Sequence, residues 1–138
     1  MADGVIEGDG WAIAVDADAF GEGYGFRKVR QVLGVTEFGI NLITIPPGFE
    51  TGRHFHERQQ ELYFVHRGTI EMGFDDGSKH EIREGGAARV DAAAVRSISN
   101  ASDSEDAQYL VVGAAGGYVG RDGKLPEGET RIRRPGDA

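Results

Sequence analysis

The sequence predicts an all-β protein built as a sandwich or a closed barrel. Apolar stretches between Trp11 and Val112 are short, and Gly, Pro, Asp or Asn residues interrupt them every several residues. This rhythm is typical of short strands joined by tight turns. The 22 glycines fit the same architecture, because tight turns need backbone conformations that glycine adopts readily. A chain of 138 residues has room for one hydrophobic core, so we expect a single domain.

The expected strands follow from apolar runs bounded by turn residues. Asp76-Gly77 predicts a hairpin with a two-residue loop, and Pro46-Pro47-Gly48 should end the strand before it. Residues 1–10 and 121–138 lack apolar periodicity, so we expect loose ends. The chain then divides into a loose segment 1–10, a barrel 11–115 and a C-terminal extension 116–138. We expect strands at 11–15, 28–33, 37–45, 54–56, 61–66, 69–74, 80–83, 87–90, 95–98 and 108–113.

Composition excludes several classes of function. The chain has no cysteine, so a bound metal must be held by nitrogen and oxygen ligands. A formal net charge of -8 opposes approach to nucleic acid, so we expect no nucleic-acid partner. No apolar run is long enough to cross a membrane, and the acidic start lacks the features of a signal peptide. We therefore expect a cytoplasmic protein without a membrane partner.

A candidate metal site lies on two neighbouring expected strands. Alternate side chains of a strand share a face, so His54 and His56 point the same way. Glu61 begins the next strand after a short polar turn, which can bring its carboxylate beside both imidazoles. Two histidines and one carboxylate suit Fe(II), Mn(II), Ni(II), Cu(II) or Zn(II) and leave coordination positions open. His66 is an odd number of positions from Glu61 on the same expected strand, so its side chain should point to the opposite face. His80 lies just after the hairpin, and neither histidine is assigned to the site.

These residues carry a family resemblance. Gly48, His54, His56, Glu61 and Gly68 have the spacing G-x5-H-x-H-x4-E-x6-G, which resembles the first cupin motif. The resemblance implies a double-stranded β-helix, or jelly-roll barrel, with a divalent metal held inside by the two histidines and the glutamate. It also implies a small single-domain cupin that forms a homodimer.

The second cupin motif is altered in this chain. In the best register it runs from Gly85 to Asn100, with Asp91, Ala93 and Arg96 at positions where the family has other residues. Arg96 stands where the family has its fourth ligand, a histidine, and a guanidinium has no lone pair to donate. At about 5 Å from a dication, its charge costs roughly 6–7 kcal/mol at an effective dielectric of about 20.

Two outcomes remain open for Arg96. In one, it pairs with Glu61 and leaves a metal-free polar pocket. In the other, three ligands still hold the ion and Arg96 binds a substrate carboxylate or phosphate. Tyr63 shares the inward parity of Glu61, so we name Arg96 and Tyr63 as candidate substrate-binding residues. Gln59 and Gln60 lie in a polar turn and are given no role, and no catalytic residue is assigned.

The sequence supports two hypotheses of function. The first is a metal-dependent cupin enzyme of the dioxygenase, isomerase or decarboxylase class that acts on a small anionic molecule. The second is a non-catalytic cupin that binds a small ligand at a degenerate metal site, and the altered second motif favours it. The fold alone does not decide between them.

Overall fold

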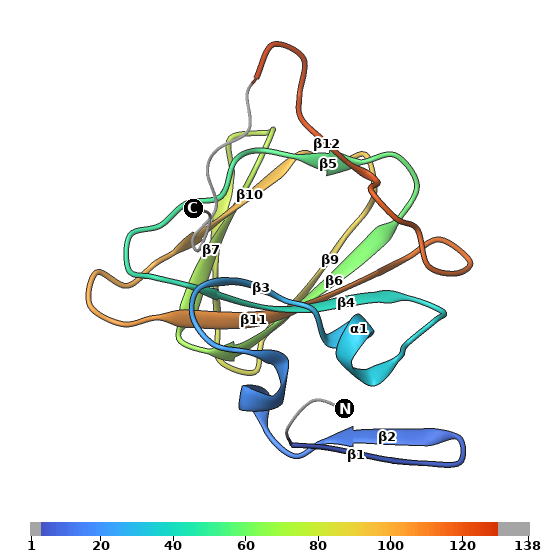
Figure 1. Cartoon of the computed structure of the whole chain (residues 1–138). Helices are drawn as coiled ribbons and strands as arrows, with labels where there is room; N and C mark the ends of the chain where they lie inside the picture. Colours follow the sequence, from blue (N-terminus) through green and yellow to red (C-terminus); the bar gives the residue numbers. More distant parts are fainter. Residues whose placement is uncertain (1–3, 130–138) are drawn as a thin grey trace.

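The computed structural model describes residues 4–129, and most of its strands form a barrel of two facing sheets (Figure 1). The larger sheet has the strand order β3-β4-β11-β6-β9, and every neighbouring pair in it is antiparallel. The expectation of an all-β barrel is confirmed. The bounds of its strands are β3 (Gly25–Arg27), β4 (Gly39–Ile45), β11 (Ala107–Ala114), β6 (Gln60–Arg67) and β9 (Ala87–Val90).

The second sheet has the order β10-β7-β8, formed by β10 (Arg96–Asn100), β7 (Thr69–Phe74) and β8 (Lys79–Arg83). Two isolated bridges, Glu50 with Ser99 and His54 with Arg96, continue it toward β5. β5 (Phe55–His56) pairs in turn with β12 (Gly123–Lys124). The segment that carries both histidines is therefore fastened to β10 on one side and to the late segment of the chain on the other.

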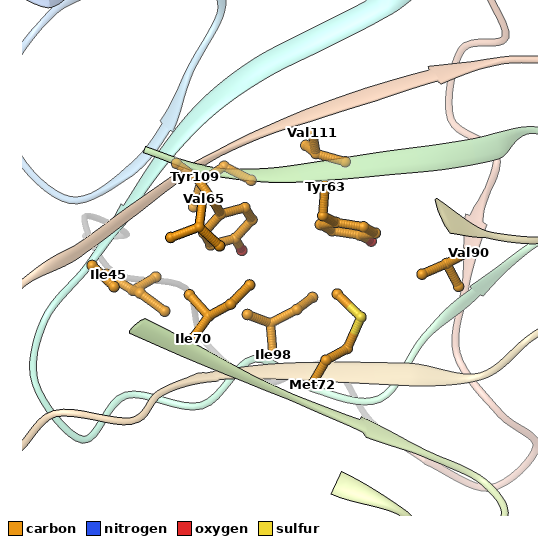
Figure 2. Packing of buried hydrophobic residues seen from close by; sticks show 11 residues of the cluster. Ile45, Tyr63, Val65, Ile70, Met72, Val90, Ile98, Tyr109 and Val111 are labelled. Carbon is orange, nitrogen blue, oxygen red and sulfur yellow. The ribbon is translucent and has the colours of Figure 1, made fainter. Parts of the chain in front are cut away.

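Alternation along β6 separates the interior from the surface. Glu61, Tyr63 and Val65 are buried, whereas Leu62 and Phe64 between them are exposed. This period of two is the pattern of a strand with one face on a core. Figure 2 shows the core between the sheets, where side chains of β6 and β11 meet those of β7 and β10. The labelled members are Ile45, Tyr63, Val65, Ile70, Met72, Val90, Ile98, Tyr109 and Val111.

The expected hairpin after β7 forms, with a longer loop than the sequence predicted. Residues 75–78 separate β7 from β8, and Gly77 has a φ of 84°. Asp76 Oδ1 accepts a hydrogen bond of 2.8 Å from the Ser78 backbone N–H. The aspartate side chain thus stabilises the turn locally, as short acidic side chains commonly do.

The predicted strand at 28–33 is wrong, because α1 (Val29–Leu33) is a short helix there. Its β-branched residues favoured a strand, but Val29 is buried and α1 packs against β4. Gly34 ends the helix with a φ of 72°, and its N–H donates to the Arg30 carbonyl. Packing against the barrel thus overrides a weak local preference for strand.

The N-terminal segment 1–10 was expected to be loose, but its described residues include a paired strand. β1 (Val5–Gly8) pairs with β2 (Trp11–Ala14) in a hairpin, which Figure 1 shows beside the barrel, followed by the short 3-10 helix η1 (Ala17–Phe20). In the expected C-terminal extension, residues 130–138 lie outside the described part, and β12 is an ordered strand. In the part of the chain that the structure describes, no helix has the length and apolarity to span a membrane.

Candidate metal centre

The three predicted ligands meet inside the barrel. His54 lies just before β5, His56 ends β5, and Glu61 is the second residue of β6. One ligand atom from each lies within 4.8 Å of the others. His56 and Glu61 are buried, and His54 is partly buried. The structure therefore brings together two imidazoles and a carboxylate that could hold one metal ion.

Glu61 accepts hydrogen bonds on both of its oxygens. Oε1 lies 2.5 Å from the Tyr63 hydroxyl and 3.2 Å from both His56 Nε2 and Arg96 Nη2, and Oε2 accepts a 2.9 Å bond from Gln59 Nε2. Burial opposes ionisation of this carboxyl, but hydrogen bonds from His56 and Tyr63, with the positive charge of Arg96, outweigh it and lower its pKa. Glu61 is therefore an anionic oxygen donor.

His54 is held as a neutral imidazole. Burial, followed by the positive charge of Arg96, lowers the pKa of His54 to about 4. Its Nδ1 lies 3.4 Å from the Gly52 carbonyl, and its ring meets that of His56 edge-on at a centroid distance of 5.5 Å. A neutral imidazole has a lone pair available on one nitrogen, as metal ligation requires.

Arg96 is fully buried, with 0% of its surface exposed. Its Nη1 donates to the carbonyls of Ala94 at 2.7 Å and Ala92 at 3.3 Å, and its Nη2 donates to Glu61. A cavity opens beside the histidines, and Arg96 is not among the described residues that line it. The direct contact with a substrate that we predicted for Arg96 stays a prediction, while its pairing with Glu61 is present in the structure.

A cavity of about 590 Å³ opens beside the histidines. Its deep wall is apolar, with Ile43, Ile98 and Val111 from three strands, and Tyr63 lines it beside Glu61. The second candidate substrate-binding residue thus does face the cavity. A space of this size accommodates a small metabolite next to the three ligand groups.

Two further residues belong to the site: Gln59, to which the sequence analysis gave no role, and Asp122, which it did not consider. Gln59 donates to Glu61, and Asp122 from the late segment is buried, with its Oδ2 3.7 Å from His56 Nδ1. The Gln59 side chain packs against Gly113. A Cβ added at Gly113 would lie only 2.6 Å from Gln59 Nε2. Asp122 lies 66 positions from His56 in a segment without apolar periodicity, so only the fold places it in the site.

The donor set fits a divalent transition metal. Two imidazoles and one ionised carboxylate are the ligands that such ions accept in proteins. Arg96 opposes metal binding. Its positively charged guanidinium contacts Glu61 Oε1, the same carboxylate oxygen that His56 contacts. The three ligand residues supply half or more of a four- to six-coordinate shell and leave positions for water or substrate.

Comparison with known proteins agrees with this architecture. The Cupin domain family matches residues 41–113, more than half of the chain, so this protein belongs to the cupin family. Many solved structures share the fold, which confirms the expected double-stranded β-helix, or jelly roll. No curated protein matches the sequence.

Three solved structures illustrate the likeness. A sugar phosphate isomerase of the cupin superfamily from Silicibacter pomeroyi is 29% identical, with a TM-score of 0.59 over 64% of this chain and 57% of its own. A proposed sugar phosphate isomerase from Acidithiobacillus ferrooxidans is 31% identical, with a TM-score of 0.56 over 64% and 56%. A cupin protein from Bacteroides fragilis is 18% identical, with a TM-score of 0.60 over 80% and 90%. This chain spans little more than half the length of the two isomerase structures.

Proposed function

We propose that this cupin binds one divalent transition metal through His54, His56 and Glu61 and uses it in isomerase-type chemistry on a small anionic substrate. The single observation that carries the proposal is the convergence of the three ligand atoms within 4.8 Å at the wall of a 590 Å³ cavity. Among the reaction classes open to a cupin, isomerisation is favoured by the two isomerase structures at 29% and 31% identity.

The cavity offers positive charge to an anionic substrate. Lys28, Arg121 and Lys124 line it and are exposed. Among the described lining residues the carboxylates are Glu61 and Asp122, which are buried and accept hydrogen bonds from the protein. The charge presented to an entering molecule is therefore mainly positive, although the whole chain carries -8. A phosphate or carboxylate at the mouth would leave the rest of a small substrate close to the histidines.

The bound ion would act as a Lewis acid toward a substrate carbonyl or hydroxyl. In this proposal Tyr63 has two functions: its ring forms part of the cavity wall, and its hydroxyl orients Glu61. Burial, followed by the nearby Glu61, raises the pKa of Tyr63 well above its ordinary value, so its hydroxyl stays protonated and donates. Arg96 keeps Glu61 ionised and fixed from behind, and the exposed cations take over direct contact with the anion.

The second candidate function is a binding protein without a metal. The observation that favours it is the surroundings of Glu61, whose two oxygens already receive hydrogen bonds from Tyr63, Arg96 and Gln59. In that case the same cavity and the same cations would capture a small anion without chemistry.

Metal analysis of protein purified without an affinity tag separates the two functions. We expect close to one equivalent of a transition metal in the native protein and none in a His54→Ala, His56→Ala variant. The control is a His66→Ala, His80→Ala variant, which removes two exposed histidines and should retain the metal. Equal and near-zero content in all three proteins, even after incubation with Fe(II), Mn(II), Ni(II), Cu(II) or Zn(II), would reject the metal-dependent function.

The homodimer implied by the cupin resemblance is part of the proposal. Ile6, Trp11 and Ile13 are each 52% exposed on one face of the β1–β2 hairpin, where Ile6 pairs with Ile13. Such clustered apolar side chains are typical of a surface that another chain covers. Light scattering coupled to size exclusion should give twice the chain mass of 14.8 kDa. Serine at these three positions should reduce it to one chain, and a monomeric native protein would contradict the proposal.

A further inference from the structure

The two ring nitrogens of His56 face different carboxylates. Nε2 lies 3.2 Å from Glu61 Oε1, on the side of the three-residue ligand group. Nδ1 is buried, and within residues 4–129 no hydrogen-bond partner lies within bonding distance of it. The carboxylate on that side is Asp122, with Oδ2 at 3.7 Å. A buried imidazole N–H without a partner is costly, so Asp122 is the group available to satisfy it.

Asp122 is held in place by the turn between β5 and β6. Its Oδ2 accepts hydrogen bonds from the backbone N–H groups of Arg58 at 2.9 Å and Gln59 at 2.8 Å, and its own carbonyl accepts one from Glu57 at 3.3 Å. The next residue, Gly123, pairs with His56 in the β12–β5 ladder. Asp122 is therefore fixed to the same turn that connects the metal ligands.

The surroundings of Asp122 favour its charged form. Its Oδ2 accepts two backbone hydrogen bonds, and such bonds favour the ionised form of a carboxyl group. An ionised carboxylate fixed by backbone donors is a strong acceptor for an imidazole N–H. Shortening the present separation by about 1 Å would give a charge-assisted hydrogen bond.

We propose that Asp122 is the positioning residue of His56: when a metal ion displaces the proton that Nε2 shares with Glu61, Asp122 holds the other proton on Nδ1 and so directs the Nε2 lone pair to the ion. This inference rests on the metal centre proposed above and assigns the late segment, outside the cupin match at 41–113, a part in it. Ligand histidines in proteins generally donate their second ring N–H to such a partner, which fixes the tautomer and the ring orientation.

The test compares Asp122→Asn with the native protein, using Zn(II) alone as the probe. The asparagine amide oxygen can still accept from the two backbone donors, so the turn is retained while the negative charge beside His56 is removed. We expect zinc affinity, measured by competition with a chelator, to fall by about 10- to 100-fold. Asp106→Asn removes an exposed carboxylate outside the cavity wall and should leave the affinity unchanged.

A second readout separates positioning from loss of structure. Nitrogen-15 spectra of the histidine rings should show a proton on His56 Nδ1 that exchanges slowly with solvent in the native protein and quickly in Asp122→Asn. The melting temperature of the metal-free variant should stay close to the native value. If Asp122→Asn fails to fold, Asp122→Ser replaces it, because a serine hydroxyl can also accept from a turn N–H.

The outcomes distinguish this inference from the proposed function. If the native protein binds no zinc, the metal-dependent function fails, and the exchange rate of the His56 Nδ1 proton in metal-free protein decides whether Asp122 holds it. If the native protein binds zinc and Asp122→Asn binds it within twofold with unchanged histidine spectra, the role of Asp122 fails alone. Loss of affinity with a changed Nδ1 resonance supports both.

Discussion

His54 and Arg96 lie directly opposite each other and exchange two backbone hydrogen bonds, each 2.9 Å long. This bridge joins the segment of the histidines to β10 and places position 96 beside the candidate metal site. The guanidinium of Arg96 consequently reaches Glu61, 35 residues away in the sequence.

Arg96→His should increase metal affinity. The substitution removes a buried positive charge next to the ion and adds an imidazole opposite His54, so we expect Zn(II) to bind at least about tenfold more tightly, a difference of about 1.4 kcal/mol. Isothermal titration calorimetry measures it. The control is Arg96→Gln, which removes the charge without adding a ligand. If Arg96→His binds zinc no more tightly than Arg96→Gln, position 96 does not direct its side chain to the ion.

Glu61→Gln should destabilise the metal-free protein. The carboxylate is the anionic partner of Arg96, which is 0% exposed, and removal of one partner of a buried pair costs about 3–5 kcal/mol. Urea denaturation in the presence of a chelator measures this change. Glu57→Gln is the matched control, because the Glu57 side chain is exposed and approaches Lys124 only at 3.9 Å. A Glu61→Gln variant as stable as this control would show that the pair contributes nothing.

Gly113→Ala and Gln59→Ala should act through one contact. An alanine Cβ at position 113 would lie 2.6 Å from Gln59 Nε2, the atom that donates to Glu61, so either substitution breaks that hydrogen bond. We expect each to weaken zinc binding by a similar factor, and the double variant to be no weaker than the worse single variant. Competition with a chelator measures the zinc affinity of the native protein, the two single variants and the double variant, which together form a double-mutant cycle. Additive effects would show that Gly113 acts on the site by another route.

Gly68→Ala should cost more stability than Gly48→Ala, although both glycines have a φ of 73°. At position 48 an added Cβ meets nothing within 4 Å, so only the left-handed backbone opposes it, at about 1–2 kcal/mol. At position 68 the Cβ would lie 2.8 Å from the Asp106 carbonyl oxygen, which is backbone and cannot turn away. Denaturant unfolding of both variants measures the difference, and equal losses would contradict the steric explanation.

The sequence predicted the barrel well because its signals are local. Turn residues such as Asp76-Gly77 and the alternation along β6 each act within a few positions, and the two histidines share a face by the geometry of one strand. The spacing to Glu61 needed only a short turn. The sequence is therefore sufficient to predict the three residues at the centre of the candidate site.

The errors concern residues whose positions depend on distant contacts. Residues 29–33 are helical because they pack on β4 and end at Gly34, not because their composition favours a helix. Asp122 becomes a site residue only when β12 pairs with β5. Arg96 gave two open outcomes because the sequence shows its position in the motif but not the three oxygen acceptors around its guanidinium.

The pairing of β12 with β5 has a consequence for the chain as a whole. Every residue of the hydrophobic core cluster lies between Ile43 and Val111, whereas Asp122 and its neighbours attach beyond it through a two-residue strand. The late segment therefore contributes to the wall of the cavity and not to this core cluster. Its detachment would leave the core contacts in place and open the cavity on the side of His56.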